Sequence, residues 1–124
     1  MLKALLLLIT VFTSSSSLAQ WVLYAEVTEA FLYIDLSTIR KDGNLRKVWV
    51  LQDLKQRQKE GALSLRARVE YDGREERDRY LSATSHSSQM AQGNLIKSQT
   101  GMSDWIDVAP GTATEDSFKK VCPK

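Results

Sequence analysis

The 124-residue chain has few of the residues on which metals and covalent chemistry depend. It holds one cysteine, Cys122, and one histidine, His86. A single cysteine excludes an internal disulfide framework, and neither residue has companions at the spacing of a metal site. Catalysis needs a base, a nucleophile or a metal in one cluster, and no predicted element assembles such a cluster. We therefore expect a non-enzymatic protein without cofactor or metal.

An excess of one charge and a long apolar run are also missing beyond the first 19 residues. Leaving out Lys3, the chain has 16 basic and 15 acidic residues, a net charge of +1 with His86 neutral. A nucleic-acid binder normally carries a basic excess on one face, so we expect no nucleic acid as partner. Spanning a bilayer takes roughly 20 apolar residues, so we expect no membrane insertion after cleavage of the segment described next.

Residues 1–19 have the pattern of a secretory signal peptide. Met1 and Lys3 form a short basic start, "ALLLLITVF" is apolar, and Ser17 and Ala19 are the small residues that signal peptidase reads. We predict cleavage after Ala19, which leaves 124 − 19 = 105 residues, 20–124, as one domain. The protein is then exported to the periplasm or outside the cell, in the bacterial cell envelope. Gln20 follows the cleavage point, where a lipoprotein would need a cysteine.

Most of the remaining chain reads as β-strand, with a short helix at its end. Residues 21–35 predict a hairpin, and residues 36–40 predict one helical turn capped by Asp35. Further strands are predicted within 44–55, 64–72, 76–87 and 92–99. Thr112 and Glu115 have the spacing of a capping box, and Pro123 ends the helix that follows. The fold class is therefore α+β, mainly β: about six antiparallel strands with one short C-terminal helix packed on one face.

The strand around Trp49 indicates a sheet that is buried on both faces. Four consecutive apolar residues, 48–51, point alternately to opposite faces of a strand. One short helix, with Phe118, Val121 and Cys122 on one stripe, covers only one face. Sheet curvature, a dimer partner or a ligand surface must cover the other, and aromatic and arginine residues favour binding.

Two neighbouring predicted strands carry candidate binding arginines. Arg66 and Arg68 alternate with apolar residues along 64–72, and Arg77 and Arg79 lie two residues apart on the strand predicted within 76–87. On the second strand we expect Arg77, Arg79, Leu81 and Ala83 on one face and Asp78, Tyr80, Ser82 and Thr84 on the other. With Trp49, the four arginines predict a basic binding patch. The alternative is that Glu70, Asp72, Glu76 and Asp78 neutralise them.

Four stretches in order resemble the bacterial surface-adhesin E domain: "WVL", "YIDLSTIRKDGNLRKVWVL", "YDGREERDRYLS" and "WIDVAPGTATEDSFKKVC". The resemblance implies a six-stranded antiparallel sheet with a C-terminal helix tied to it by a disulfide. It also implies dimers and binding of vitronectin and laminin, as in the best-known member. The first family cysteine falls where this chain has Gly73, whereas the second matches Cys122. We expect position 122 to lie within bonding reach of the bend at 73.

Without that disulfide, Cys122 is either a thiol packed against the sheet or a handle for an intermolecular disulfide. The residues and the resemblance together predict an exported binding domain that contacts host matrix or other macromolecules, chiefly a protein ligand, through a preformed sheet surface. A homodimer is one expected assembly. The alternatives are a periplasmic structural or assembly accessory and a small inhibitor of an envelope enzyme.

Overall fold

The computed structural model describes residues 19–124, so all but the last residue of the predicted signal peptide lie outside the described residues. The elements in chain order are β1 (Val22–Glu26), β2 (Ala30–Asp42), β3 (Leu45–Leu54), β4 (Ser64–Asp72), β5 (Arg77–His86), the 3-10 turn η1 (Gln89–Ala91), β6 (Leu95–Thr100), β7 (Ile106–Asp107) and α1 (Ala113–Val121). The prediction of a mainly β chain with one C-terminal helix is confirmed.

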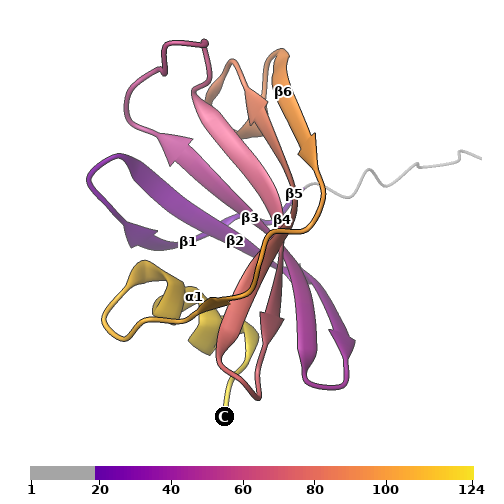
Figure 1. Cartoon of the computed structure of the whole chain (residues 1–124). Helices are drawn as coiled ribbons and strands as arrows, with labels where there is room; N and C mark the ends of the chain where they lie inside the picture. The colour runs from indigo at the N-terminus through magenta and orange to yellow at the C-terminus, as the bar shows by residue number, and fades with distance from the viewer. Residues whose placement is uncertain (1–18) are drawn as a thin grey trace, which may run out of the picture.

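All the strands join one antiparallel sheet, in the order β1-β2-β3-β4-β5-β6. From β1 to β6 each strand pairs with the next one in the sequence, so this part of the sheet is a meander (Figure 1). The segment 92–99, predicted as the last strand, overlaps β6 from Leu95 onward. The two-residue strand β7 lies off this path and pairs with the start of β5. The chain therefore runs back along β5 in two segments, β6 beside its second half and β7 beside its start, before it enters α1.

The predicted helical turn at residues 36–40 is wrong, because β2 runs through it to Asp42. Asp35 does accept the amide of Ser37, at 3.1 Å, as a capping aspartate would. The Thr38 hydroxyl donates to the Asp35 carbonyl and accepts the Trp49 amide, at 3.0 Å. These bonds keep the chain beside β3 as an irregularity between Asp35 and Arg40, where the strand register shifts.

The predicted faces of β5 are correct only in its first half. Val69 pairs with Tyr80, but its neighbour Arg68 pairs with Ser82, so Leu81 is the extra residue of a bulge. Because a bulge shifts the alternation by one residue, Ala83 changes sides. Arg77 and Arg79 consequently share a face with Ser82 and Thr84, and not with Ala83 as expected.

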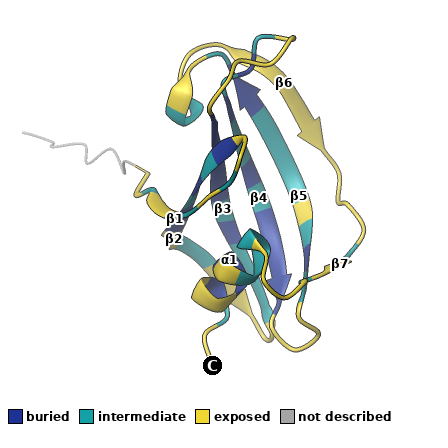
Figure 2. Ribbon diagram, turned by 90° about the vertical axis from the view of Figure 1, so that its left-hand side faces the viewer, coloured by how far each residue is buried: buried dark blue, intermediate teal, exposed yellow. Residues whose placement is uncertain are grey.

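The helix α1 begins and ends where the sequence predicts. The Thr112 hydroxyl accepts the Glu115 amide at 3.3 Å, and the Glu115 carboxylate reaches back to the Gly111 amide at 3.5 Å. Phe118 and Val121 are buried against the sheet, where they complete a core made of Ile34, Val48, Val50, Ala67, Val69 and Tyr71. Burying an apolar side chain of this size contributes about 1.5–3 kcal/mol. Packing therefore holds α1 on the sheet, beside the β4–β5 hairpin (Figure 2).

Candidate functional site

The five predicted binding residues all lie on the sheet face opposite α1, which we call the open face. Cross-strand partners in a sheet point to the same side. Val50 and Ala67 are partners that belong to the core under α1, so their neighbours Trp49 and Arg68, also partners, point away from it. Arg66 lies two residues before Arg68 on β4, so it points to the same side. On β5, Arg77 and Arg79 are the cross-strand partners of Asp72 and Glu70, which also point to this side.

One end of the open face is covered by η1. The Met90 amide donates to the Asp53 carboxylate at 2.9 Å, and the Ala91 amide donates to the Ser64 hydroxyl at 2.9 Å. Asp53 and Ser64 are paired residues of β3 and β4, and both are buried. Residues 48–51 predict a sheet that is buried on both faces, and at this end of the open face the chain itself supplies the cover.

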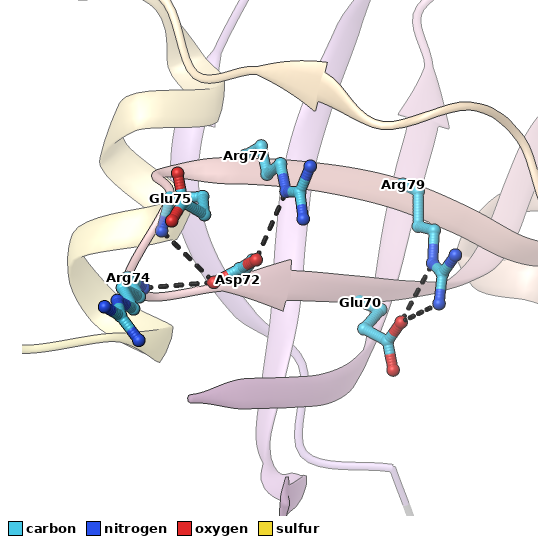
Figure 3. Close-up of polar contacts among 6 residues, drawn as sticks. All are labelled: Glu70, Asp72, Arg74, Glu75, Arg77 and Arg79. Carbon is cyan, nitrogen blue, oxygen red and sulfur yellow. Dashed lines mark hydrogen bonds and ion pairs between the residues drawn. The ribbon is translucent and has the colours of Figure 1, made fainter. Parts of the chain in front are cut away.

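The opposite end is covered by Trp105. The guanidinium carbons of Arg77 and Arg79 lie 4.6 Å and 4.2 Å from the centre of its ring. Arg79 donates two hydrogen bonds to Glu70, at 2.6 Å and 2.9 Å, and Arg77 donates one to Asp72, at 3.2 Å (Figure 3). Trp105 was missed by the sequence analysis, since it lies in a segment without a periodic pattern.

Arg77 and Arg79 are thus neutralised, as the alternative interpretation expected, but by two of the four acids named. Burial by itself would raise the pKa of Asp72; the amides of Glu75 and Arg74 and the Arg77 guanidinium outweigh it and lower that pKa (Figure 3). Asp78 is paired with Tyr71, so it points to the helix face. Glu76 forms no ion pair within residues 19–124.

Between these two covered ends the open face has a hollow of about 540 Å³. Its lining residues are Ala19, Trp21, Asp35, Ser37, Thr38, Arg40, Trp49, Arg66 and Arg68. The Arg66 guanidinium lies over the Trp49 ring, 4.9 Å from its centre. The sequence analysis named Trp49, Arg66 and Arg68. It missed Arg40, which it assigned to a helical turn outside the sheet, and it gave Trp21 no place in a site.

The hollow has an excess of positive charge. In the part of the chain that the structure describes, Arg40, Arg66 and Arg68 form no side-chain hydrogen bond or ion pair, and the buried Nε of Arg66 has no acceptor. Asp35 is the acidic residue of the lining, and its carboxylate accepts the amides of Gln20, at 3.0 Å, and Ser37. The hollow therefore combines three arginines that have no acidic partner among the described residues with the indole rings of Trp21 and Trp49.

The other chemically reactive residues lie apart from this hollow. The His86 ring nitrogen Nε2 is 2.8 Å from the Thr84 hydroxyl, and burial together with the Arg66 charge lowers the pKa of His86. Cys122 is a half-buried free thiol beside the core, and burial raises its pKa. Residues 19–124 contain no group of three His, Cys, Asp or Glu side chains placed to hold a metal ion.

None of the helices among the described residues is long and apolar enough to cross a membrane. A comparison with curated proteins gives no match to this chain. The family model for surface-adhesin protein E matches residues 21–123.

Solved structures with a similar fold include crystal form II of Haemophilus influenzae protein E, with a TM-score of 0.67 and 13% identity. That match covers 82% of this chain and 86% of the other. Protein E from non-typeable Haemophilus influenzae is similar with a TM-score of 0.65 and 14% identity, over 87% of this chain and 78% of the other. At such low identity these structures support the fold.

Proposed function

Since this chain belongs to the surface-adhesin protein E family, we propose that it is an exported, non-enzymatic protein that binds a macromolecule through the open face. The observation that carries the proposal is the uncovered centre of that face. The chain covers one end with η1 and the other with Trp105, yet leaves Trp49, Arg66 and Arg68 around a hollow. Tryptophan and arginine are the residue types most enriched at binding hot spots.

Binding on this surface needs no covalent step and no change of fold. The strands that carry Trp49, Arg66 and Arg68 are central in the sheet and hydrogen-bonded on both sides. A preformed surface loses little conformational entropy when it binds. The hairpin between β4 and β5 holds Arg77 and Arg79 in ion pairs, so the unpaired arginines of the hollow are the better contacts.

The proposal is tested with the mature chain and a panel of matrix proteins. Vitronectin and laminin, which the family resemblance implies, are immobilised beside serum albumin, and binding is followed by biolayer interferometry. We expect saturable binding to a matrix protein that Trp49→Ala weakens at least tenfold, whereas Trp105→Ala weakens it less. Binding to none of the matrix proteins would contradict an adhesin role.

The second candidate is a periplasmic accessory, and Gln20 favours it. A lipid-bearing cysteine at this position would anchor the chain in a membrane, and this sequence has glutamine there. Protease treatment of intact cells followed by fractionation distinguishes the two candidates. A protected chain released only with the periplasmic fraction supports the accessory role; a chain that is digested on intact cells supports adhesion.

A homodimer is a further expectation, and light scattering of the mature chain with and without reductant tests it. A dimer that persists in reductant indicates a noncovalent interface over the open face or a sheet edge. A dimer lost on reduction implicates Cys122, whose thiol is half-buried in the single chain.

A further inference from the structure

We propose that the hollow between Trp21 and Trp49 binds a carboxylate of an acidic peptide segment, with Arg40, Arg66 and Arg68 supplying the positive charge. This inference rests on the proposed function and names the chemistry of its ligand. A macromolecule docked on the open face would place one glutamate or aspartate of an exposed segment in the hollow.

The charge distribution of the hollow carries the inference. Three arginines from β2 and β4 line it, and none forms an ion pair within residues 19–124. On the same face, Arg77 and Arg79 lie beside acids that neutralise them. Asp35 offsets only one of these three charges, and its two oxygens accept bonds from Gln20 and Ser37 and none from the arginines. An arginine without an internal acceptor is suited to a carboxylate, which its planar group binds with two parallel hydrogen bonds.

Arg66 is the arginine of the three whose side chain is best fixed in place before a ligand binds. Its guanidinium stacks on Trp49 at 4.9 Å, and its Nε is buried without an acceptor. Stacking fixes the group before a ligand arrives, so less side-chain entropy is lost on binding. A buried donor without a partner is unfavourable in the free protein. A bound anion at the same guanidinium would compensate its charge.

The indole rings of the hollow, and the acidic residues beside it on the open face, favour a peptide over an extended polyanion as the ligand. Trp21 and Trp49 offer apolar surface for a side chain next to the carboxylate. A sulfated glycan or a nucleic acid presents a row of anionic groups, and binding it needs a continuous basic surface. Here Glu70 and Asp72, beside Arg79 and Arg77, interrupt the basic surface on the same face. One anionic group beside an apolar one matches the hollow.

The test uses two capped peptides of equal length, one with glutamates on both sides of a leucine and one with glutamines in their place. Binding to the mature chain is followed by NMR, through the indole N–H signals of Trp21 and Trp49. The single histidine is a second reporter: a bound carboxylate offsets the Arg66 charge, so the pKa of His86 rises toward its ordinary value.

We expect the glutamate peptide to shift both indole signals and the glutamine peptide to shift neither. The double variant Arg66→Gln with Arg68→Gln should weaken binding at least tenfold, and Arg40→Gln, which changes an exposed side chain, should weaken it by a smaller factor. Arg74→Gln is the matched control, since it removes an exposed arginine outside the hollow. Unchanged circular dichroism establishes that each variant is folded.

Equal binding of the two peptides, or glutamate-peptide binding that survives Arg40→Gln and the double variant, would overturn the inference. A heparin oligosaccharide is tested in the same assay. If it binds far more tightly than the peptide, and if Arg74→Gln weakens its binding as much as the double variant does, the face would be assigned to a polyanion instead. Matrix-protein binding that is unaffected by the double variant would refute this site and leave the proposed function standing.

Discussion

Gly73 and Cys122 touch across the fold. A β-carbon added at Gly73 would lie 3.4 Å from the Cys122 sulfur and 3.5 Å from the Cys122 β-carbon. The second distance is at the short end of the range found in disulfides, about 3.5–4.5 Å. The φ angle of Gly73 is not positive, so the turn does not require a glycine there; Glu76 is the residue with a φ of 52°. The bend and the end of α1 therefore meet as the sequence predicted.

The first prediction is that Gly73→Cys forms a disulfide with Cys122 when the chain is exported. Closing a loop of about 50 residues stabilises a fold by about 2–4 kcal/mol, less any strain. The Asn44 carbonyl oxygen lies 3.4 Å from the added carbon, at the short end of ordinary van der Waals contact, so the turn has room for the new side chain. Mass spectrometry detects the bond, and urea unfolding with and without reductant measures its effect. The controls are Gly73→Ser and Gly73→Cys with Cys122→Ser; free thiols in the exported single variant would show the geometry to be wrong.

The second prediction concerns the buried hydrogen bond that joins β4 to α1. The Tyr71 hydroxyl donates to the Ser117 oxygen at 2.8 Å, and Ser117 donates to the Thr114 carbonyl at 2.9 Å. Tyr71→Phe removes a donor whose acceptor keeps its other bond, so we expect a loss of about 0.5–1.5 kcal/mol. Ser117→Ala leaves the tyrosine hydroxyl buried without a partner and should cost about 1–3 kcal/mol. Urea unfolding of the single and double variants gives the coupling; a larger loss for Tyr71→Phe would contradict this order.

The third prediction compares a buried ion pair with an exposed one. The Glu70 carboxylate is 4% exposed and accepts two bonds from Arg79, whereas Lys119 in the pair with Glu115 is 70% exposed. Arg79→Gln should therefore destabilise the fold by about 3 kcal/mol, since it leaves the buried Glu70 carboxylate without its partner. Lys119→Gln should change stability by about 0.5 kcal/mol or less. Adding Glu70→Gln to Arg79→Gln should restore part of the loss, and no recovery in the double variant would contradict the pairing.

The fourth prediction is a pH dependence set by His86. Burial and the Arg66 charge lower its folded-state pKa, so the unfolded chain takes up a proton first as the pH falls. The stability that neutral His86 provides is complete above its unfolded pKa of about 6.5. It is lost as the pH falls from there through the lowered folded-state pKa. Urea unfolding between pH 7.5 and pH 5 should show this decline, and His86→Gln should flatten it; an equal slope in the variant would exclude His86 as the cause.

The fifth prediction concerns the expected cleavage after Ala19. The Gln20 nitrogen lies 3.0 Å from the Asp35 carboxylate, which is 3% exposed. Cleavage would turn that amide into a charged amino group and the hydrogen bond into an ion pair. Intact mass of the exported chain tests the cleavage point. Asp35→Asn should destabilise the mature chain more than a chain extended by residues before Gln20, and equal losses would show that the charge at Gln20 plays no part.

The sequence predicted those features that depend on neighbours along the chain. The capping box at Thr112 and the alternation of 64–72 act within a few residues, and both are in the structure. The same local logic failed at residues 36–40: a capping aspartate was present, but the hydrogen bond from the Trp49 amide to Thr38 keeps this segment in the sheet. It failed again at Leu81, since a bulge is set by pairing with β4 and leaves no mark in the alternation.

The sequence by itself determined the antiparallel strands, the C-terminal helix and the likeness to one family, because periodicity, caps and turns are local chemistry. Only the tertiary structure decided which arginines are neutralised. Trp105 reaches Arg77 and Arg79 from more than 20 residues further along the chain, and Arg40 joins Arg66 through the order of the strands. A binding surface is made of side chains that the sheet brings together, and their separation in the sequence carries no record of that proximity.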